Sequence, residues 1–197
     1  IAGEKFISKR NVAMILGDNF FYGQNLSSKL MQNTKLKTGA KIVLHKVQKP
    51  EAFGVAKIKS NKKIISIKEK PKKFFSDLAI TGLYFFDNKV VNYAKKLKPS
   101  KRNELEIVDL LNIYRKKNKL TADLIGRGGA WLDTGSIEDF YKTSAFVSAI
   151  ENRQGFKIAC LEEIAYNFKW ISKKNIKNAM KFYGNCNYSK YLNNLIS

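Results

Sequence analysis

Hydrophobic and polar residues follow two different periods along this chain, which predicts alternating strands and helices. Apolar runs of strand length are separated by segments in which apolar residues recur every three or four positions. The clearest helical stripe lies in residues 104–117. The predicted strands are residues 12–16, 41–47, 55–58, 64–67, 79–86, 120–125 and 131–133. The predicted helices are residues 88–97, 104–117, 136–152, 161–170, 174–182 and 188–196, with one more between Asn25, as its cap, and Gly39.

The order of these elements indicates an α/β fold. Strands and helices alternate over the first two thirds of the chain, and only helices follow. This order predicts a three-layer α/β domain at residues 1–153 and a C-terminal helical extension at residues 154–197. The extension contains many aromatic residues. They either pack back onto the domain or form a subunit interface, where aromatic side chains are enriched.

The composition describes a globular protein with a strongly basic surface. The net charge is +21, and 32 of the 37 basic residues are lysines spread along the whole chain. Proteins that read bases rely on arginine for bidentate contacts to guanine, so this surface favours anionic small molecules over nucleic acid as partners. The only cysteines are Cys160 and Cys186, which indicates a cytoplasmic protein without a disulfide framework. No apolar stretch approaches the roughly 18 residues needed to span a membrane.

Two aspartates stand at the ends of short apolar strands. Asp18 follows Ile15-Leu16-Gly17, and Asp133 follows Trp131-Leu132. In open α/β sheets, ligands bind at the carboxyl edge of the strands. Two carboxylates at that edge could share a hard cation such as Mg²⁺, which is typically held by one or two carboxylates together with substrate phosphates. The pair therefore favours an enzyme that acts on phosphates.

Four further signals are weaker, and each is also compatible with a purely structural role. Glu69 and Lys70 follow a predicted strand and could bind a sugar hydroxyl and a phosphate. Gly82 lies inside an apolar strand, where a glycine often marks a close approach of a ligand or of backbone. Arg102 precedes the clearest helix and could hold a phosphate at its N-terminus. His45 is the only histidine, and we interpret it as structural.

The order and spacing of these motifs carry more information than any one of them. The most specific pair is Leu-Gly-Asp-Asn at residues 16–19 and Trp-Leu-Asp-Thr-Gly at residues 131–135. Together the segments resemble the glucose-1-phosphate thymidylyltransferases, a family of sugar-phosphate nucleotidyltransferases, over essentially the whole chain. The matching segments are residues 16–22, 53–55, 69–71, 80–87, 102–109, 126–135, 153–155 and 162–165.

The resemblance implies a fold, a reaction and a set of residues. The fold is a Rossmann-like α/β fold with a mixed sheet, whose N-terminal strands this chain lacks. The reaction converts glucose 1-phosphate and dTTP to dTDP-glucose and pyrophosphate, which supplies dTDP-rhamnose and related deoxysugars. The implied catalytic residues are Asp18, Lys70, Arg102 and Asp133, with Mg²⁺ held by the two aspartates. The implied substrate-binding residues are Asn19, Gly54, Glu69, Lys70, Ile80, Tyr84 and Arg102.

The resemblance also implies regulation and assembly, and it shows two departures. The family forms homotetramers. It also has a second site, at which the end-product sugar nucleotide binds and inhibits the enzyme, near positions matching Tyr22, Gly23, Arg127, Glu163 and Ile164. The family's nucleotide-binding loop, Gly-x-Gly-Thr-Arg-Leu, has no counterpart in this sequence, and Phe53 stands where the family has Tyr. Because the sheet would lack its first strands and expose its edges, we expect these 197 residues alone to fold poorly and to be inactive. Two other readings stay open, a uridylyltransferase of the same fold and a non-catalytic remnant that binds sugar phosphate or nucleic acid.

Overall fold

The computed structural model describes residues 2–100 and 103–197. The chain forms two compact units, Ile1–Ser136 and Ile137–Ser197, and each is described here by itself. The division lies at the start of helix α5 (Ile137–Gln154), whereas the sequence had placed it after that helix. Thr143 is the one buried residue of α5, and no residue of this helix belongs to a hydrophobic core cluster of the described chain.

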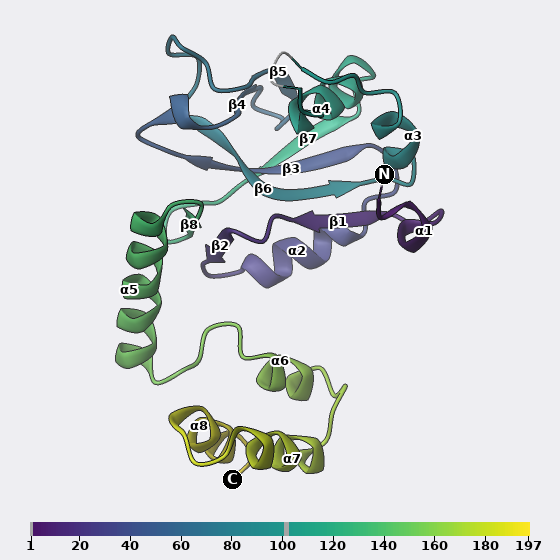
Figure 1. Ribbon diagram of the computed structural model, residues 1–197. Helices are drawn as coiled ribbons and strands as arrows, with labels where there is room; N and C mark the ends of the chain where they lie inside the picture. Colours follow the sequence, from purple (N-terminus) through teal and green to yellow (C-terminus); the bar gives the residue numbers. More distant parts are fainter. Residues whose placement is uncertain (1, 101–102) are drawn as a thin grey trace. The chain divides into compact units, whose positions relative to one another are not determined.

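The first unit is built on a mixed sheet. Within the described residues the sheet has six strands in the order β5-β4-β6-β3-β7, and β1 also pairs with β6. The long strand β6 is buried along almost its whole length and runs antiparallel to β1, β3 and β4, while β3 and β7 are parallel (Figure 1). The strands are β1 (Val12–Ile15), β3 (Ala40–Lys46), β4 (Val55–Ile58), β5 (Ile64–Lys68), β6 (Leu78–Phe86) and β7 (Leu120–Leu124).

Helices cover both faces of this sheet, which confirms the predicted three layers. Alternate residues of β6 point to opposite faces, so Tyr84 and Phe86 join one core while Leu83 and Phe85 join the other. Helix α4 (Ile107–Lys116) packs its predicted apolar stripe into the larger core. Helix α2 (Leu26–Thr34) lies on the opposite face (Figure 1). The short helices of this unit are α1 (Glu4–Ile7), the 3₁₀ turn η1 (Pro50–Ala52) and α3 (Val90–Ala94).

A second, two-stranded sheet pairs segments that lie far apart in the sequence. Strand β2 (Asn19–Tyr22) runs antiparallel to β8 (Ala130–Asp133), with Asn19 opposite Asp133. The sequence predicted most of β8 but missed β2, because β2 is only four residues long and its stabilising partner comes more than a hundred residues later. Asn25 does precede α2, but its φ of +60° lies in the left-handed region and its side chain makes no capping hydrogen bond.

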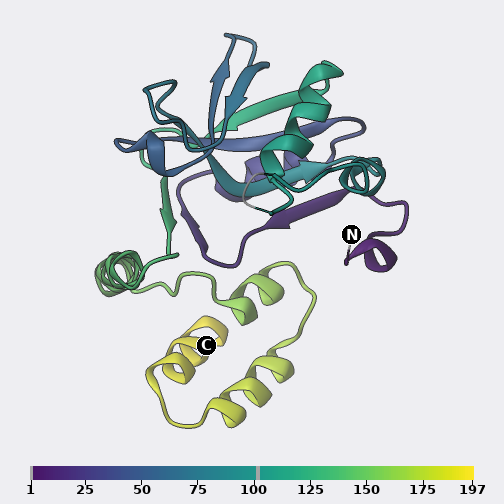
Figure 2. The same ribbon diagram turned by 45° about the horizontal axis from the view of Figure 1, so that its top comes forward.

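The second unit contains helices α5, α6 (Leu161–Asn167), α7 (Lys173–Tyr183) and α8 (Asn187–Ile196). Helices α7 and α8 pack side by side as a hairpin (Figure 2). The core among them is small and consists of Cys160, Ile176, Leu192 and Ile196 with partly buried neighbours. No helix in the described part of the chain is long and apolar enough to cross a membrane.

Tyrosine–carboxylate hydrogen bonds link α6 to the α7–α8 hairpin. Tyr188 Oη donates to Glu162 Oε2 at 2.5 Å, and Tyr183 Oη donates to Glu162 Oε1 at 2.8 Å. Tyr191 Oη donates to Glu163 Oε2 at 2.5 Å. Some aromatic residues of the extension are therefore used inside the unit. Others stay exposed within it, including Trp170 at 71% and Phe182 at 86%, and a role in subunit contacts stays a prediction.

The first prediction concerns Tyr188. We expect Tyr188→Phe to lower the free energy of unfolding of the second unit by about 1–2 kcal/mol, because Glu162 loses its shortest hydrogen bond. Amide hydrogen exchange of α8, measured alongside urea unfolding, reports this change locally. Tyr141→Phe is the matched control, since Tyr141 is 74% exposed. Equal protection of α8 in both variants would show that the network contributes nothing.

The second prediction concerns pH. Burial alone would raise the pKa of the Glu162 carboxyl, but hydrogen bonds from Tyr188 and Tyr183 outweigh it and lower the pKa below the ordinary 4.5. The resulting stability is fully present above pH 4.5 and is lost as the pH falls through the lower folded-state pKa. We expect Glu162→Gln to flatten this acid dependence of the urea midpoint, whereas Glu138→Gln leaves it intact. Identical acid profiles for the wild type and Glu162→Gln would refute the assignment.

Candidate active site

The two aspartates are brought together by the β2–β8 pair. Asp18 immediately precedes β2, and Asp133 is the last residue of β8. Both the backbone N and the Oγ1 of Thr134 donate to the Asp18 carbonyl, at 2.7 and 2.8 Å. The end of one strand is thereby fixed to the beginning of the other, so the two side chains start from adjacent backbone positions.

The carboxylates approach a common point near Gly135. A Cβ placed on Gly135 would lie 3.0 Å from Asp133 Oδ1 and 3.8 Å from Asp18 Oδ2. Asp133 Oδ1 accepts from the Gly135 N at 2.8 Å, and Asp18 Oδ1 accepts from Asn19 Nδ2 at 2.7 Å. No group of three or more His, Cys, Asp or Glu ligands occurs among the described residues. The pair therefore suits a cation that takes its remaining ligands from a bound phosphate or water.

Asn19 orients the site through its carboxamide. Its Oδ1 accepts from Trp131 Nε1 at 2.5 Å and from the Gly82 N at 3.2 Å. An oxygen that accepts two donors fixes the orientation of the amide, so Nδ2 is directed at the Asp18 carboxylate. A Cβ on Gly82 would lie only 2.7 Å from the Asn19 carboxamide. The group that comes close to this strand glycine is therefore the Asn19 side chain, whereas the sequence had suggested a ligand or backbone.

A cavity of about 210 Å³ opens beside this network. Strand β6 forms one side, the loop before β4 and the end of β5 form another, and β8 contributes Trp131. The cavity brings together seven of the predicted catalytic and substrate-binding residues, namely Asn19, Gly54, Glu69, Lys70, Ile80, Tyr84 and Asp133. Arg102 lies outside the described residues. Asp18 is not among the cavity's lining residues but contacts it through Asn19.

The positions of Glu69 and Lys70 depend on a neighbouring glycine and on an uncommon backbone conformation. A Cβ on Gly54 would lie 2.9 Å from Glu69 Oε2, so glycine is needed there for the carboxylate to reach its position. Lys70 has a φ of +36°, which is uncommon for a residue with a Cβ, and its N donates to the Phe53 carbonyl at 3.1 Å. Strained backbone of this kind persists where the surrounding structure holds it, and it is common at functional sites.

Tyr84 contributes a hydroxyl that stays protonated. Burial, followed by the negative charge of Glu69, raises the pKa of Tyr84 to about 12. The phenol is therefore a hydrogen-bond donor at neutral pH. His45 is not among the residues that line the cavity. Burial lowers the pKa of its imidazole, and its ring lies in an edge contact with the ring of Trp131.

Trp131 was not among the predicted site residues, although it belongs to the most specific motif. Its indole donates to Asn19, and its ring meets Phe53 edge-on with centroids 5.0 Å apart. Phe53 therefore packs its ring against Trp131, and the hydroxyl of the family's tyrosine has no counterpart here. An aromatic residue within a four-residue strand was the available signal for Trp131, but its partner Asn19 could not be identified from sequence.

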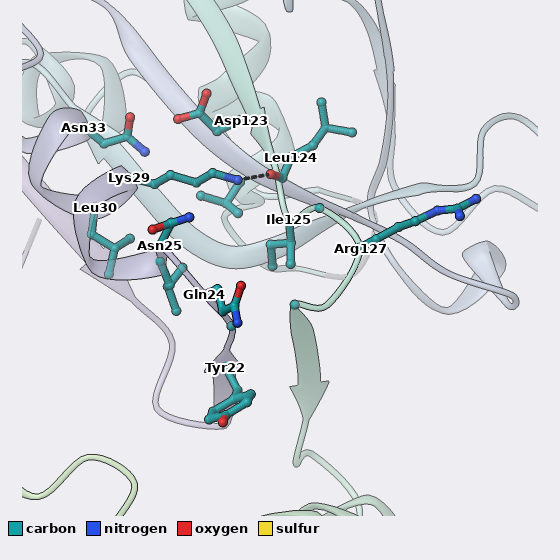
Figure 3. A pocket seen from close by; sticks show the side chains of 15 residues that line it. Tyr22, Gln24, Asn25, Lys29, Leu30, Asn33, Asp123, Leu124, Ile125 and Arg127 are labelled. Carbon is teal, nitrogen blue, oxygen red and sulfur yellow. Dashed lines mark hydrogen bonds between the residues drawn. The ribbon is translucent and has the colours of Figure 1, made fainter.

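The residues of the predicted regulatory site are divided between the two units. Tyr22, Gly23 and Arg127 line a second cavity of the first unit, whereas Glu163 and Ile164 lie on α6. The side chains of Tyr22 and Arg127 point away from that cavity (Figure 3). Glu163 is hydrogen-bonded to Tyr191 within its own unit. A site that unites these five residues stays a prediction.

Comparison with known proteins shows the family to which the chain belongs. The profile of the family described as Nucleotidyl transferase matches residues 1–150. The chain belongs to the nucleotidyl transferase family. The glucose-1-phosphate thymidylyltransferase of Neisseria gonorrhoeae is 45% identical over 196 residues, which are 100% of this chain and 68% of that protein. That of Xanthomonas campestris pv. campestris (strain B100) is 38% identical over 192 residues, 98% of this chain and 65% of that protein.

Solved structures of nucleotidyltransferases agree with this assignment. A Bacillus anthracis protein described as a glucose-1-phosphate thymidylyltransferase, in complex with sucrose, is 42% identical with a TM-score of 0.65, covering 74% of this chain and 57% of that one. A UDP-glucose pyrophosphorylase complexed with UDP-glucose has a TM-score of 0.63 at 24% identity, which shows the shared fold alone. The chain is thus a nucleotidyltransferase of the thymidylyltransferase group and spans about two thirds of these relatives' length.

The third prediction tests the role of Gly82. We expect Gly82→Ala to displace the Asn19 carboxamide and to lower the free energy of unfolding by about 1–3 kcal/mol, because the new Cβ takes the space of that group. The sequence has two tryptophans, so in a Trp170→Phe background Trp131 alone reports urea unfolding by its fluorescence.

Gly17→Ala is the matched control for this experiment. A Cβ at Gly17 meets nothing within 4 Å, and the substitution removes the same backbone freedom two residues before β2 begins. If the two variants unfold at the same urea concentration with the same Trp131 emission, the close packing of Asn19 on β6 is not a constraint on this site.

Proposed function

We propose that a protein containing this chain transfers the thymidylyl group of dTTP to glucose 1-phosphate, giving dTDP-glucose and pyrophosphate. The observation that carries the proposal is the convergence of Asp18 and Asp133 beside a cavity lined by Glu69, Lys70 and Tyr84. The relatives named glucose-1-phosphate thymidylyltransferase supply the substrate pair.

The proposed chemistry is an in-line displacement at phosphorus. A phosphate oxygen of glucose 1-phosphate attacks the α-phosphorus of dTTP. The bond between the α-phosphorus and the oxygen that bridges it to the β-phosphorus breaks, and pyrophosphate leaves. The attacking phosphate is already ionised at neutral pH, so the step needs no general base from the protein. Two carboxylates that approach one point fit Mg²⁺, which would offset the negative charge that develops around the α-phosphorus.

The chain's own residues position the sugar phosphate. The ammonium group of Lys70 pairs with its phosphate, while the Glu69 carboxylate accepts from a glucose hydroxyl. Tyr84 remains protonated and adds a donor within the same cavity. Asn19 keeps Asp18 in place and also borders the sugar. Arg102 is proposed as a second cation for the phosphate. Holding two anions in one geometry is a large part of catalysis in reactions of this type.

Binding of the dTTP triphosphate is assigned to the family's Gly-rich loop, which these 197 residues do not contain. Activity is therefore proposed for a protein that carries both that loop and this chain. A cytoplasmic location, a tetrameric assembly and inhibition by the end-product sugar nucleotide at Tyr22, Gly23, Arg127, Glu163 and Ile164 belong to the same proposal.

The fourth prediction concerns the two carboxylates. In a protein with the loop, we expect Asp18→Asn and Asp133→Asn each to lower turnover of dTTP and glucose 1-phosphate by roughly 100-fold or more, because the metal contributes several kcal/mol. Binding of Mn²⁺, followed by electron paramagnetic resonance, should weaken in parallel. Asp139→Asn on α5 is the matched control and should behave as the wild type.

Two outcomes would count against this proposal. Wild-type turnover in either aspartate variant would remove the metal role of the pair. Preferential use of UTP over dTTP by the unmodified protein would favour a uridylyltransferase over a thymidylyltransferase, and it would leave the carboxylate assignment untouched.

A further inference from the structure

The first unit contains a second cavity on the opposite face of the sheet. It has a volume of about 230 Å³ and lies between α2 and the C-terminal end of β7 (Figure 3). Its apolar wall is formed by Leu30, Val43 and Ile125. None of these side chains belongs to the cavity that holds the predicted substrate residues. This α2–β7 cavity has no role in the chemistry proposed above.

An unpartnered amide faces into the α2–β7 cavity. Asn33 is 2% exposed, and its Nδ2 has no hydrogen-bond partner among the described residues. Its Oδ1 accepts from Lys41 Nζ at 2.9 Å, so the carboxamide cannot exchange its two ends without losing that bond. A buried N–H group without an acceptor is costly, and such groups are rare in folded proteins. The orientation of Asn33 therefore calls for an acceptor atom inside the cavity (Figure 3).

A lysine supplies a second donor. Lys29 lies one helical turn before Asn33 on α2, and its Nζ donates to the Leu124 carbonyl at 3.1 Å. An ammonium group has three N–H donors, so this contact leaves donor capacity toward the cavity. The carboxylate of Asp123 also lines the cavity, but it forms ion pairs with Lys41 at 3.6 Å and Lys62 at 3.4 Å. The local charge is therefore positive despite Asp123.

The amides at the entrance complete the lining. Gln24 and Asn25 lie in the turn before α2 and both border the cavity. The cavity thus has an apolar wall, an amide entrance and two converging donors at one end. Its volume is that of several water molecules and is below the usual size of a cofactor site.

We propose that the α2–β7 cavity binds a small metabolite through an anionic oxygen, which accepts hydrogen bonds from Asn33 Nδ2 and Lys29 Nζ. A carboxylate or a phosphate group supplies the required acceptor, and the apolar part of the molecule packs against Leu30, Val43 and Ile125. The predicted regulatory residues Tyr22, Gly23 and Arg127 also border this cavity, but the side chains of Tyr22 and Arg127 point away from it (Figure 3). The proposed contacts therefore use other groups.

The fifth prediction tests this site with two probes, inorganic phosphate and butyrate. Each is titrated into isotope-labelled protein at constant ionic strength while the side-chain NH₂ signals of Asn33 are followed by NMR. We expect a saturable shift of these signals at millimolar probe concentration. Saturation by phosphate alone identifies a phosphate ligand, and saturation by butyrate alone identifies a carboxylate.

Two variants and a matched control separate the site from the general basic surface. We expect Lys29→Met to weaken binding at least about 10-fold, since one charge-assisted hydrogen bond is lost. Asn33→Leu fills the amide's place with an apolar group and should weaken binding similarly, measured by calorimetry. Lys177→Met removes the same charge from exposed α7 and should bind as the wild type.

Several results would overturn the proposal. No saturable shift with either probe would mean that ordered water alone satisfies Asn33. Equal weakening by Lys29→Met and Lys177→Met would mean that the probes bind the basic surface. Because the wild-type titration is decisive by itself, the test holds even where a variant fails to fold.

Discussion

The pairing of β2 with β8 is the interaction on which the candidate active site depends. It joins two four-residue strands from opposite ends of the first unit and sets Asn19 opposite Asp133. Without this register, Asp18 and Asp133 would be two unrelated strand-end carboxylates. With it, the hydrogen bonds from Thr134 to Asp18 and from Trp131 to Asn19 form between neighbours. The paired backbone thereby fixes these side chains relative to one another.

Close packing around two glycines gives the site its shape. Gly82 allows the Asn19 carboxamide to lie against β6, and Gly54 allows the Glu69 carboxylate to lie beside β4. The Asn19 carboxamide and the Glu69 carboxylate thus occupy the space that a Cβ on these two glycines would take. The same cavity includes the buried phenol of Tyr84, whose raised pKa follows from burial and from Glu69. The Glu69 carboxylate therefore links two features: it fits beside Gly54, and its charge helps to raise the pKa of Tyr84.

The second unit uses polar contacts where its core is small. Four buried residues form that core, and three phenol–carboxylate hydrogen bonds connect α6 with α7 and α8. Such bonds are stronger than neutral ones because one partner is charged. They also give Glu163 a structural partner in Tyr191, so any ligand that needs Glu163 has to compete with this contact.

The sequence by itself determined most elements, the three layers and the chemistry available to the site. Periodicity located the buried strand β6 and the apolar stripe of α4, because each pattern depends on residues only two to four positions apart. Motif spacing singled out Asp18, Glu69, Lys70 and Asp133. Strand β2, the division before α5, the partner of Trp131 and the burial of Asn33 were decided only by the tertiary structure. The physical reason is that these features depend on contacts between residues far apart in the sequence. Such contacts leave no local pattern of hydrophobic and polar residues.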